Sequence, residues 1–126
     1  DPDSASDVTR GQSVPSFVES VDLAPTVLEW LGVGKPDRFQ GQSLMGALRG
    51  DDRYQGKGEI HYEFDYRSGA RQVEPDTDMD QHLLWVLRDA RYKYVQFADV
   101  RMPPLLFDLE RDPGEFENLA DKAEYG

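Results

Sequence analysis

The segment from Leu83 to Ala120 constrains the fold of this chain most strongly. It holds three dense runs of aromatic and branched apolar residues, separated by strand-breaking residues: 83–87, 92–97 and 105–109. Such runs predict a β-meander, and the turn-forming Asp112-Pro113-Gly114 then predicts a short closing helix from about Glu115. The first two runs carry apolar residues at consecutive positions, so both faces of their hairpin are expected to be covered.

A fourth strand is predicted over Glu59–Tyr66, where apolar residues alternate with polar ones as they do in a half-buried strand. Residues 68–81 contain Gly69, Pro75 and several carboxylates but few apolar side chains. They are expected to form an excursion between paired strands, or equally a functional lid.

A helix is predicted from Asp22 to Leu31, because Asp22 suits an N-cap, Pro25 lies in the first turn and Gly32 suits the position after the end. Its large apolar residues recur with the spacing of one buried stripe: Leu23, Val27, Trp30 and Leu31. A second, short helix is predicted from Ser43 to Leu48, ending at Gly50. The fold class is therefore α+β: a small antiparallel sheet of about four strands packed with one longer helix and one or two short helices.

The composition is acidic, with a formal net charge of -11 over 126 residues. This charge disfavours nucleic acid and anionic membranes as partners, because both are bound through excess Lys and Arg. The sequence has no run of 18 apolar residues that would predict a membrane span. With no cysteine, it offers no thiolate chemistry and leaves the compartment open between cytoplasm and periplasm.

The candidate site residues lie on the strand at 59–66. His61, Glu63 and Asp65 alternate along it and are therefore expected to share one face. They would form an acid/base group or shape a substrate entrance if this face lined a cleft, whereas the same alternation also describes an ordinary solvated face. The other histidine, His82, is expected at a strand edge.

A calcium loop is the alternative suggested by an acidic cluster: Asp108, Glu110, Asp112, Glu115 and Glu117. The EF-hand pattern fails, however, because Pro113 stands at the required glycine and Leu119 at the bidentate glutamate. Turn chemistry and a helix N-terminus account for these carboxylates. The sequence also lacks a Gly-x-Ser-x-Gly elbow and a complete glycine-rich phosphate loop.

Five segments, in this order, resemble the later part of the sulfatase family: 21–32, 40–44, 61–67, 87–95 and 106–120. The segment His61–Arg67 is most similar to the branch of phosphonate monoester hydrolases and arylsulfatases. The resemblance implies that residues 18–126 are the C-terminal subdomain of an alkaline-phosphatase-like α/β hydrolase, and that residues 1–17 connect it to a missing N-terminal catalytic domain. The polar start at Asp1 fits a piece of a longer polypeptide.

For the parent protein, the resemblance implies a divalent metal (Ca, Mn or Mg) and a formylglycine made within Cys/Ser-x-Pro-x-Arg. Ser13-Val14-Pro15-Ser16-Phe17 approaches that motif but has Phe17 in place of the arginine, so the match is interpreted as coincidence. No catalytic or metal residue is carried over. The chain is therefore expected to be an inactive fragment of a hydrolase of sulfate, phosphonate or phosphate esters; the alternative is a non-catalytic acidic binding or assembly module. Homo-oligomers are expected if the face of the helix at 22–31 is uncovered.

Overall fold

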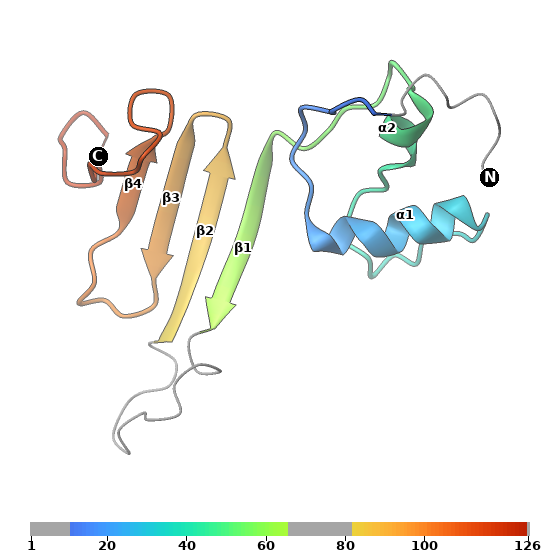
Figure 1. Cartoon of the computed structure of the whole chain (residues 1–126). Helices are drawn as coiled ribbons and strands as arrows, with labels where there is room; N and C mark the ends of the chain where they lie inside the picture. The colour runs from blue at the N-terminus through green and yellow to red at the C-terminus, as the bar shows by residue number, and fades with distance from the viewer. Residues whose placement is uncertain (1–10, 66–81, 126) are drawn as a thin grey trace. The chain divides into compact units, whose positions relative to one another are not determined.

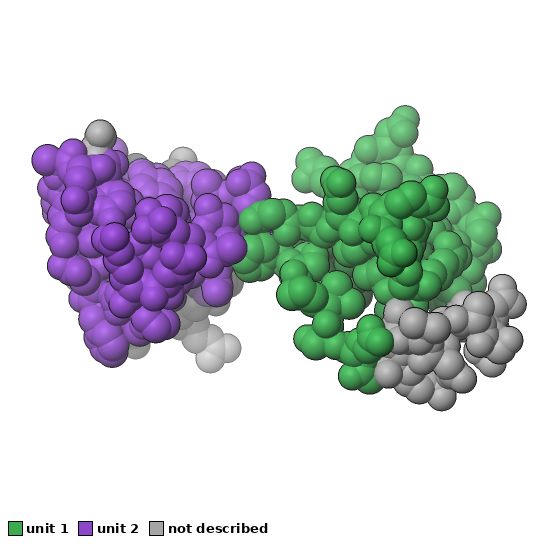
Figure 2. Space-filling model, turned by 90° about the horizontal axis from the view of Figure 1, so that it is seen from above, with its two compact units in different colours: residues 1–58 green, residues 59–126 purple. Residues whose placement is uncertain are grey.

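The computed structural model describes residues 11–65 and 82–125, and the chain divides into two compact units, residues 1–58 and 59–126 (Figure 2). Each unit is described separately below. The predicted excursion at 68–81 lies outside the described residues. The assignment of residues 18–126 to one subdomain stays a prediction.

The second unit is built on a four-stranded antiparallel sheet whose strands follow one another in chain order (Figure 1). The strands are β1 Glu59–Asp65, β2 Leu83–Asp89, β3 Tyr92–Phe97 and β4 Leu105–Asp108. Each pairs only with its neighbours in the chain, as a meander requires. The predicted meander and the added first strand are thus confirmed.

One face of this sheet carries the core of the unit. Val86 lies opposite Tyr62 on one side and Val95 on the other, while Leu84 lies opposite Phe97. Residues opposite one another in an antiparallel pair share a face, and Leu84, Val86 and Val95 are all buried there.

The opposite face is open, and here the predicted cover on both faces is wrong within the described structure. Trp85, Leu87 and Tyr94 are 41%, 38% and 36% exposed. A continuous apolar run shows that a strand has two apolar faces, but it does not identify what covers the second one.

After β4, residues 109–125 form a series of turns, so the predicted closing helix from Glu115 is not formed. Glu115 has a left-handed backbone with φ of 57°. Side chains also take the place of helical partners: Asp112 Oδ2 accepts the Glu117 N–H at 2.8 Å, and Asn118 Oδ1 accepts the N–H groups of Ala120 and Leu106. Asp and Asn are well suited to this competition with helical hydrogen bonds.

The first unit, called the helical unit to distinguish it from the sheet unit of residues 59–126, contains the described helices. They are η2 Ser20–Asp22, α1 Leu23–Trp30 and α2 Met45–Arg49 (Figure 1). They match the two predicted helices closely. Ser43 Oγ accepts the N–H of Met45, and Gly50 ends α2 in the left-handed region with φ of 68°. Since only glycine adopts that conformation without cost, Gly50 is an efficient stop.

The predicted burial of the apolar residues along α1 is wrong for the described structure. Leu23, Val27, Trp30 and Leu31 are 59%, 47%, 53% and 63% exposed. The buried residue of α1 is Pro25, on the other side of the helix. The sequence pattern located the apolar face correctly, and this face is exposed.

Candidate functional site

The predicted site residues on β1 lie on the open face of the sheet. His61 is opposite Leu87, Glu63 is opposite Trp85, and Asp65 follows at the end of the strand. His61, Glu63 and Asp65 therefore share a face with the exposed Trp85 and Tyr94, as their alternation predicted.

His61 Nε2 lies 3.2 Å from Oε1 of Glu59, two residues earlier on the same strand. Both side chains are well exposed. The described arrangement is an acidic strip with one histidine beside an aromatic surface. It provides polar groups that can contact a solute, but no buried acid/base pair.

Carboxylates of the acidic cluster at 108–117 are engaged in bonds that hold the end of the sheet unit together. Asp108, 1% exposed, accepts hydrogen bonds from Arg91 through Nε at 3.2 Å and Nη2 at 2.9 Å. Its other oxygen accepts the N–H groups of Glu110 and Arg111. The Arg91 guanidinium holds the pKa of Asp108 below its ordinary value, despite the opposing effect of burial.

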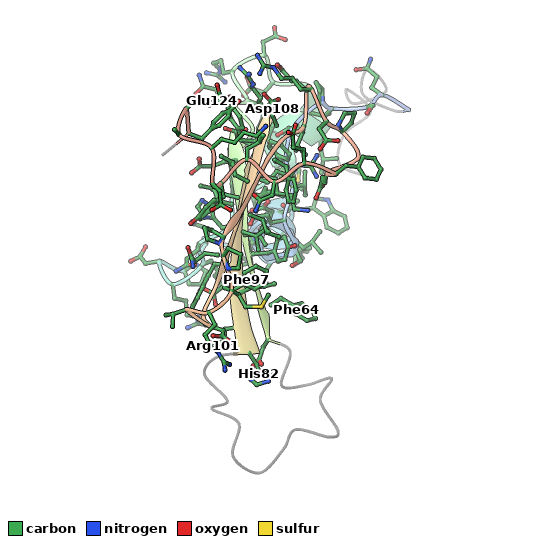
Figure 3. The ribbon with its side chains drawn as sticks, turned by 90° about the vertical axis from the view of Figure 1, so that its left-hand side faces the viewer. Phe64, His82, Phe97, Arg101, Asp108 and Glu124 are labelled. Atoms are coloured by element: carbon green, nitrogen blue, oxygen red, sulfur yellow. The ribbon has the colours of Figure 1, made fainter. Side chains whose placement is uncertain are left out.

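The neighbouring carboxylates have similar partners. Glu115 Oε2 lies 2.6 Å from Lys93 Nζ, and Glu117 Oε1 lies 2.6 Å from Lys122 Nζ. Figure 3 shows Asp108 and Glu124 near one end of the unit, and His82 and Arg101 near the other. His82 therefore does not join this cluster.

Within residues 11–65 and 82–125, no three or more His, Cys, Asp or Glu side chains converge as metal ligands would. The described residues thus do not fit the divalent-metal site that the resemblance implies for the parent. Ser16, in the near-match to the formylglycine motif, donates its hydroxyl to the Phe17 carbonyl, and Phe17 forms an isolated β-bridge with Lys57. Within this part of the chain, the segment serves local structure.

A second charged centre lies in the helical unit and was not identified from the sequence. The Asp22 side chain is fully buried; Oδ2 accepts the Glu19 N–H and Oδ1 the Gln42 N–H, both at 2.8 Å. Lys57 Nζ lies 2.7 Å from Oδ1 of Asp22 and also donates to the Glu19 carboxylate. Three segments that are distant in the chain meet at this one carboxylate: residues 19–22, Gln42 and Lys57.

Both charges at this centre are stabilised. Burial alone would raise the pKa of Asp22, but hydrogen bonds from Lys57 and from the two backbone amides outweigh it and lower the pKa. Burial likewise opposes the charge of Lys57, yet its bonds to Asp22 and Glu19 raise its pKa. An acid held ionised and a base held protonated are poorly suited to exchange protons near neutral pH, so the centre is structural. Asp22 was predicted as an N-cap, but no sequence spacing could have paired it with Lys57.

Comparison with known proteins connects this architecture to a family. Residues 4–126 match the family described as "N-sulphoglucosamine sulphohydrolase, C-terminal". The chain belongs to this sulphohydrolase C-terminal family.

Individual members confirm the assignment. The chain is 42% identical over 118 residues to the "Multifunctional alkaline phosphatase superfamily protein PehA" of Trinickia caryophylli, an alignment that covers 91% of this chain and 23% of that protein. It is 33% identical to Arylsulfatase K of Xenopus laevis, with 90% of this chain and 20% of the relative covered.

Solved structures show the same sulphohydrolase C-terminal fold. The phosphonate monoester hydrolase of Agrobacterium radiobacter superposes with a TM-score of 0.76 at 33% identity, and that of Silicibacter pomeroyi with 0.74 at 30%. In both cases the match covers 91% of this chain and 23% of the other. The chain therefore spans under a quarter of the length of these relatives, and it corresponds to their C-terminal part. No helix in the described parts of the chain is long and apolar enough to cross a membrane.

Proposed function

We propose that this chain is the C-terminal part of a hydrolase that cleaves sulfate, phosphonate or phosphate esters, and that it has no catalytic activity by itself. The observation that carries the proposal is the alignment with PehA, which accounts for 91% of this chain but only 23% of the relative. Two further relatives bear names of the arylsulfatase and phosphonate monoester hydrolase classes. In this proposal the divalent metal and the formylglycine belong to a catalytic domain outside these residues.

The chemistry of the described residues supports an auxiliary role. The buried carboxylates Asp22 and Asp108 are held ionised by cations and backbone amides. The chain also has no Cys/Ser-x-Pro-x-Arg motif in which a formylglycine could be made. The work of this part would then be to cover the catalytic domain and to shape the approach of the substrate.

The face of β1 that carries His61, Glu63 and Asp65 is the proposed contribution to the substrate entrance. It places hydrogen-bonding side chains beside the exposed Trp85, and this combination of an apolar surface with a few polar groups is typical of ligand-binding surfaces. Because these residues are proposed to contact substrate only on its way in, they should affect binding more than chemistry.

The central test is to sequence the reading frame upstream of Asp1 and to assay its product. The resemblance to sulfatases implies that a parent hydrolase carries two motifs there: Cys/Ser-x-Pro-x-Arg and the Asp-His-Gly segment that holds the metal in that family. The purified chain should not turn over an aryl sulfate or a phosphonate ester with Ca, Mn or Mg, whereas the whole reading-frame product should. Metal-dependent turnover by the chain alone, or an upstream sequence without these motifs, would refute the proposal.

The entrance is tested in the active product with Glu63→Gln, using Glu110→Gln on another exposed carboxylate as the matched control. Glu63→Gln should change KM while kcat stays constant, and Glu110→Gln should change neither. Equal kinetics for both variants would remove β1 from the substrate path.

A further inference from the structure

Helix α1 has two chemically different sides. On one side, polar side chains contact other residues of the helical unit. Thr26 Oγ1 accepts the Leu44 N–H at 3.0 Å, and Glu29 Oε1 lies 3.1 Å from Arg49 Nη1 of α2. Pro25 is buried on that side. This side of α1 is therefore satisfied by its own unit.

The other side is a stripe of large apolar side chains, here called the α1 stripe: Leu23, Val27, Trp30 and Leu31. All four are about half exposed or more, and none is charged or polar. In a surface helix this side would carry charged and polar residues. A helix that is apolar on the side facing away from its unit has the pattern of a helix enclosed within a larger protein.

We infer that the α1 stripe is the docking face for the catalytic region of the parent hydrolase, an inference that rests on the proposed function. The amount of polypeptide outside the chain supports this occupant. The relatives extend well beyond the aligned region, which is 23% of PehA, and α1 lies within the aligned part. A large apolar partner surface is thus expected in the same protein.

Charge argues against two other occupants. A second copy would bring together two chains that each carry a formal net charge of -11, and this repulsion opposes stable pairing. An anionic membrane is disfavoured for the same reason.

The experiment uses a matched pair of substitutions. Val27→Glu places a carboxylate in the α1 stripe, and Val100→Glu makes the same change at a position that is 94% exposed in the sheet unit. Each chain is mixed with the separately purified upstream part of the reading frame, and affinity is measured by calorimetry. Both variants should keep the helical signal at 222 nm, because both positions are exposed in this chain. Val27→Glu should weaken the affinity by about tenfold or more, and Val100→Glu should leave it unchanged.

When Trp85 is replaced by Phe, the fluorescence of Trp30 reports directly on whether the α1 stripe is covered. This emission should be that of an exposed indole in the chain alone and should shift to shorter wavelength in a 1:1 complex. Equal affinities for the two glutamate variants would overturn the inference while leaving the proposed function intact. The same holds if Trp30 is already buried in the chain alone, or if it becomes buried only in a dimer of this chain. An upstream product without the catalytic motifs would overturn both.

Discussion

The buried carboxylate of Asp22 allows the sharpest test of how the helical unit is held together. In Asp22→Asn one oxygen remains, but the amide nitrogen must face either the Glu19 N–H or the Gln42 N–H together with the Lys57 ammonium. All of these groups are donors, so none can accept a hydrogen bond from the amide. The wild-type carboxylate accepts three close contacts, at 2.8, 2.8 and 2.7 Å. The substitution therefore removes a charge-assisted bond and leaves a buried donor without its acceptor.

The expected loss of unfolding free energy is about 3 kcal/mol, the lower part of the range for removing one partner of a buried ion pair. The lower part applies because Lys57 retains its bond to Glu19 and its side chain is 19% exposed. The described helices all lie in residues 20–49, so urea unfolding followed at 222 nm reports on this unit. Faster hydrogen exchange at the Gln42 amide would locate the effect at the broken bond.

The matched control is Asp51→Asn, which removes a carboxylate that pairs with Arg53 at the surface. Exposed ion pairs contribute little to stability, so the urea midpoint of Asp51→Asn should remain at the wild-type value. An equal effect of the two substitutions would refute the assignment of Asp22 as the centre of the unit.

The pH dependence of Asp22 follows from the direction of its shift. Its folded pKa lies below the ordinary value of 3.8, so its contribution to stability is present above that value and is lost as pH falls through the folded pKa. Asp22→Asn should therefore reduce the acid dependence of unfolding below about pH 4. Lys57 acts at the other end: its pKa is raised, so its contribution is present below 10.5 and is lost as pH rises through the folded pKa.

Three further results are expected. Gly50→Ala should cost about 1 kcal/mol because φ is 68° there, whereas Gly58→Ala, with open space at the added Cβ, should be close to neutral in the same urea titration. The pKa of Asp99, lowered to about 2 by its hydrogen bonds to Arg101, should rise toward 3.8 in Arg101→Gln when followed by NMR; an unchanged value would exclude this pair as the cause. The isolated chain should bind a hydrophobic dye and self-associate weakly, and Trp30→Glu should reduce both; a monomer that binds no dye would contradict the exposed stripe.

The features that could be predicted from the sequence are local. The β-meander was predicted because dense apolar runs and breakers are read within a few residues, and α2 because Ser43 and Gly50 mark its two ends. The shared face of His61 and Glu63 likewise follows from strand alternation, although their role stays a prediction.

The features that could not be predicted depend on contacts between distant residues or on side-chain competition. The pairing of Asp22 with Lys57 follows no spacing rule. The tail after β4 has an acidic, helix-compatible composition, but Asp112 and Asn118 bind its backbone and Glu115 adopts a left-handed conformation. Periodicity identified the apolar face of α1, but it contains no information about the surface that covers that face.

The two charged centres and the exposed apolar surfaces together separate what this chain can do alone from what it requires a partner for. Asp22 and Asp108 each hold loop amides and a cation in place. Within the described residues, every buried side-chain nitrogen and oxygen has a hydrogen-bond partner. Large apolar side chains, in contrast, are still uncovered: Trp30 and Trp85 remain 53% and 41% exposed. A chain that depends on a partner only for apolar cover should bind that partner with little dependence on salt, because the ion pairs are already made internally. A strong loss of affinity for the upstream part between low and high salt would instead indicate a charged interface and would contradict docking through the α1 stripe.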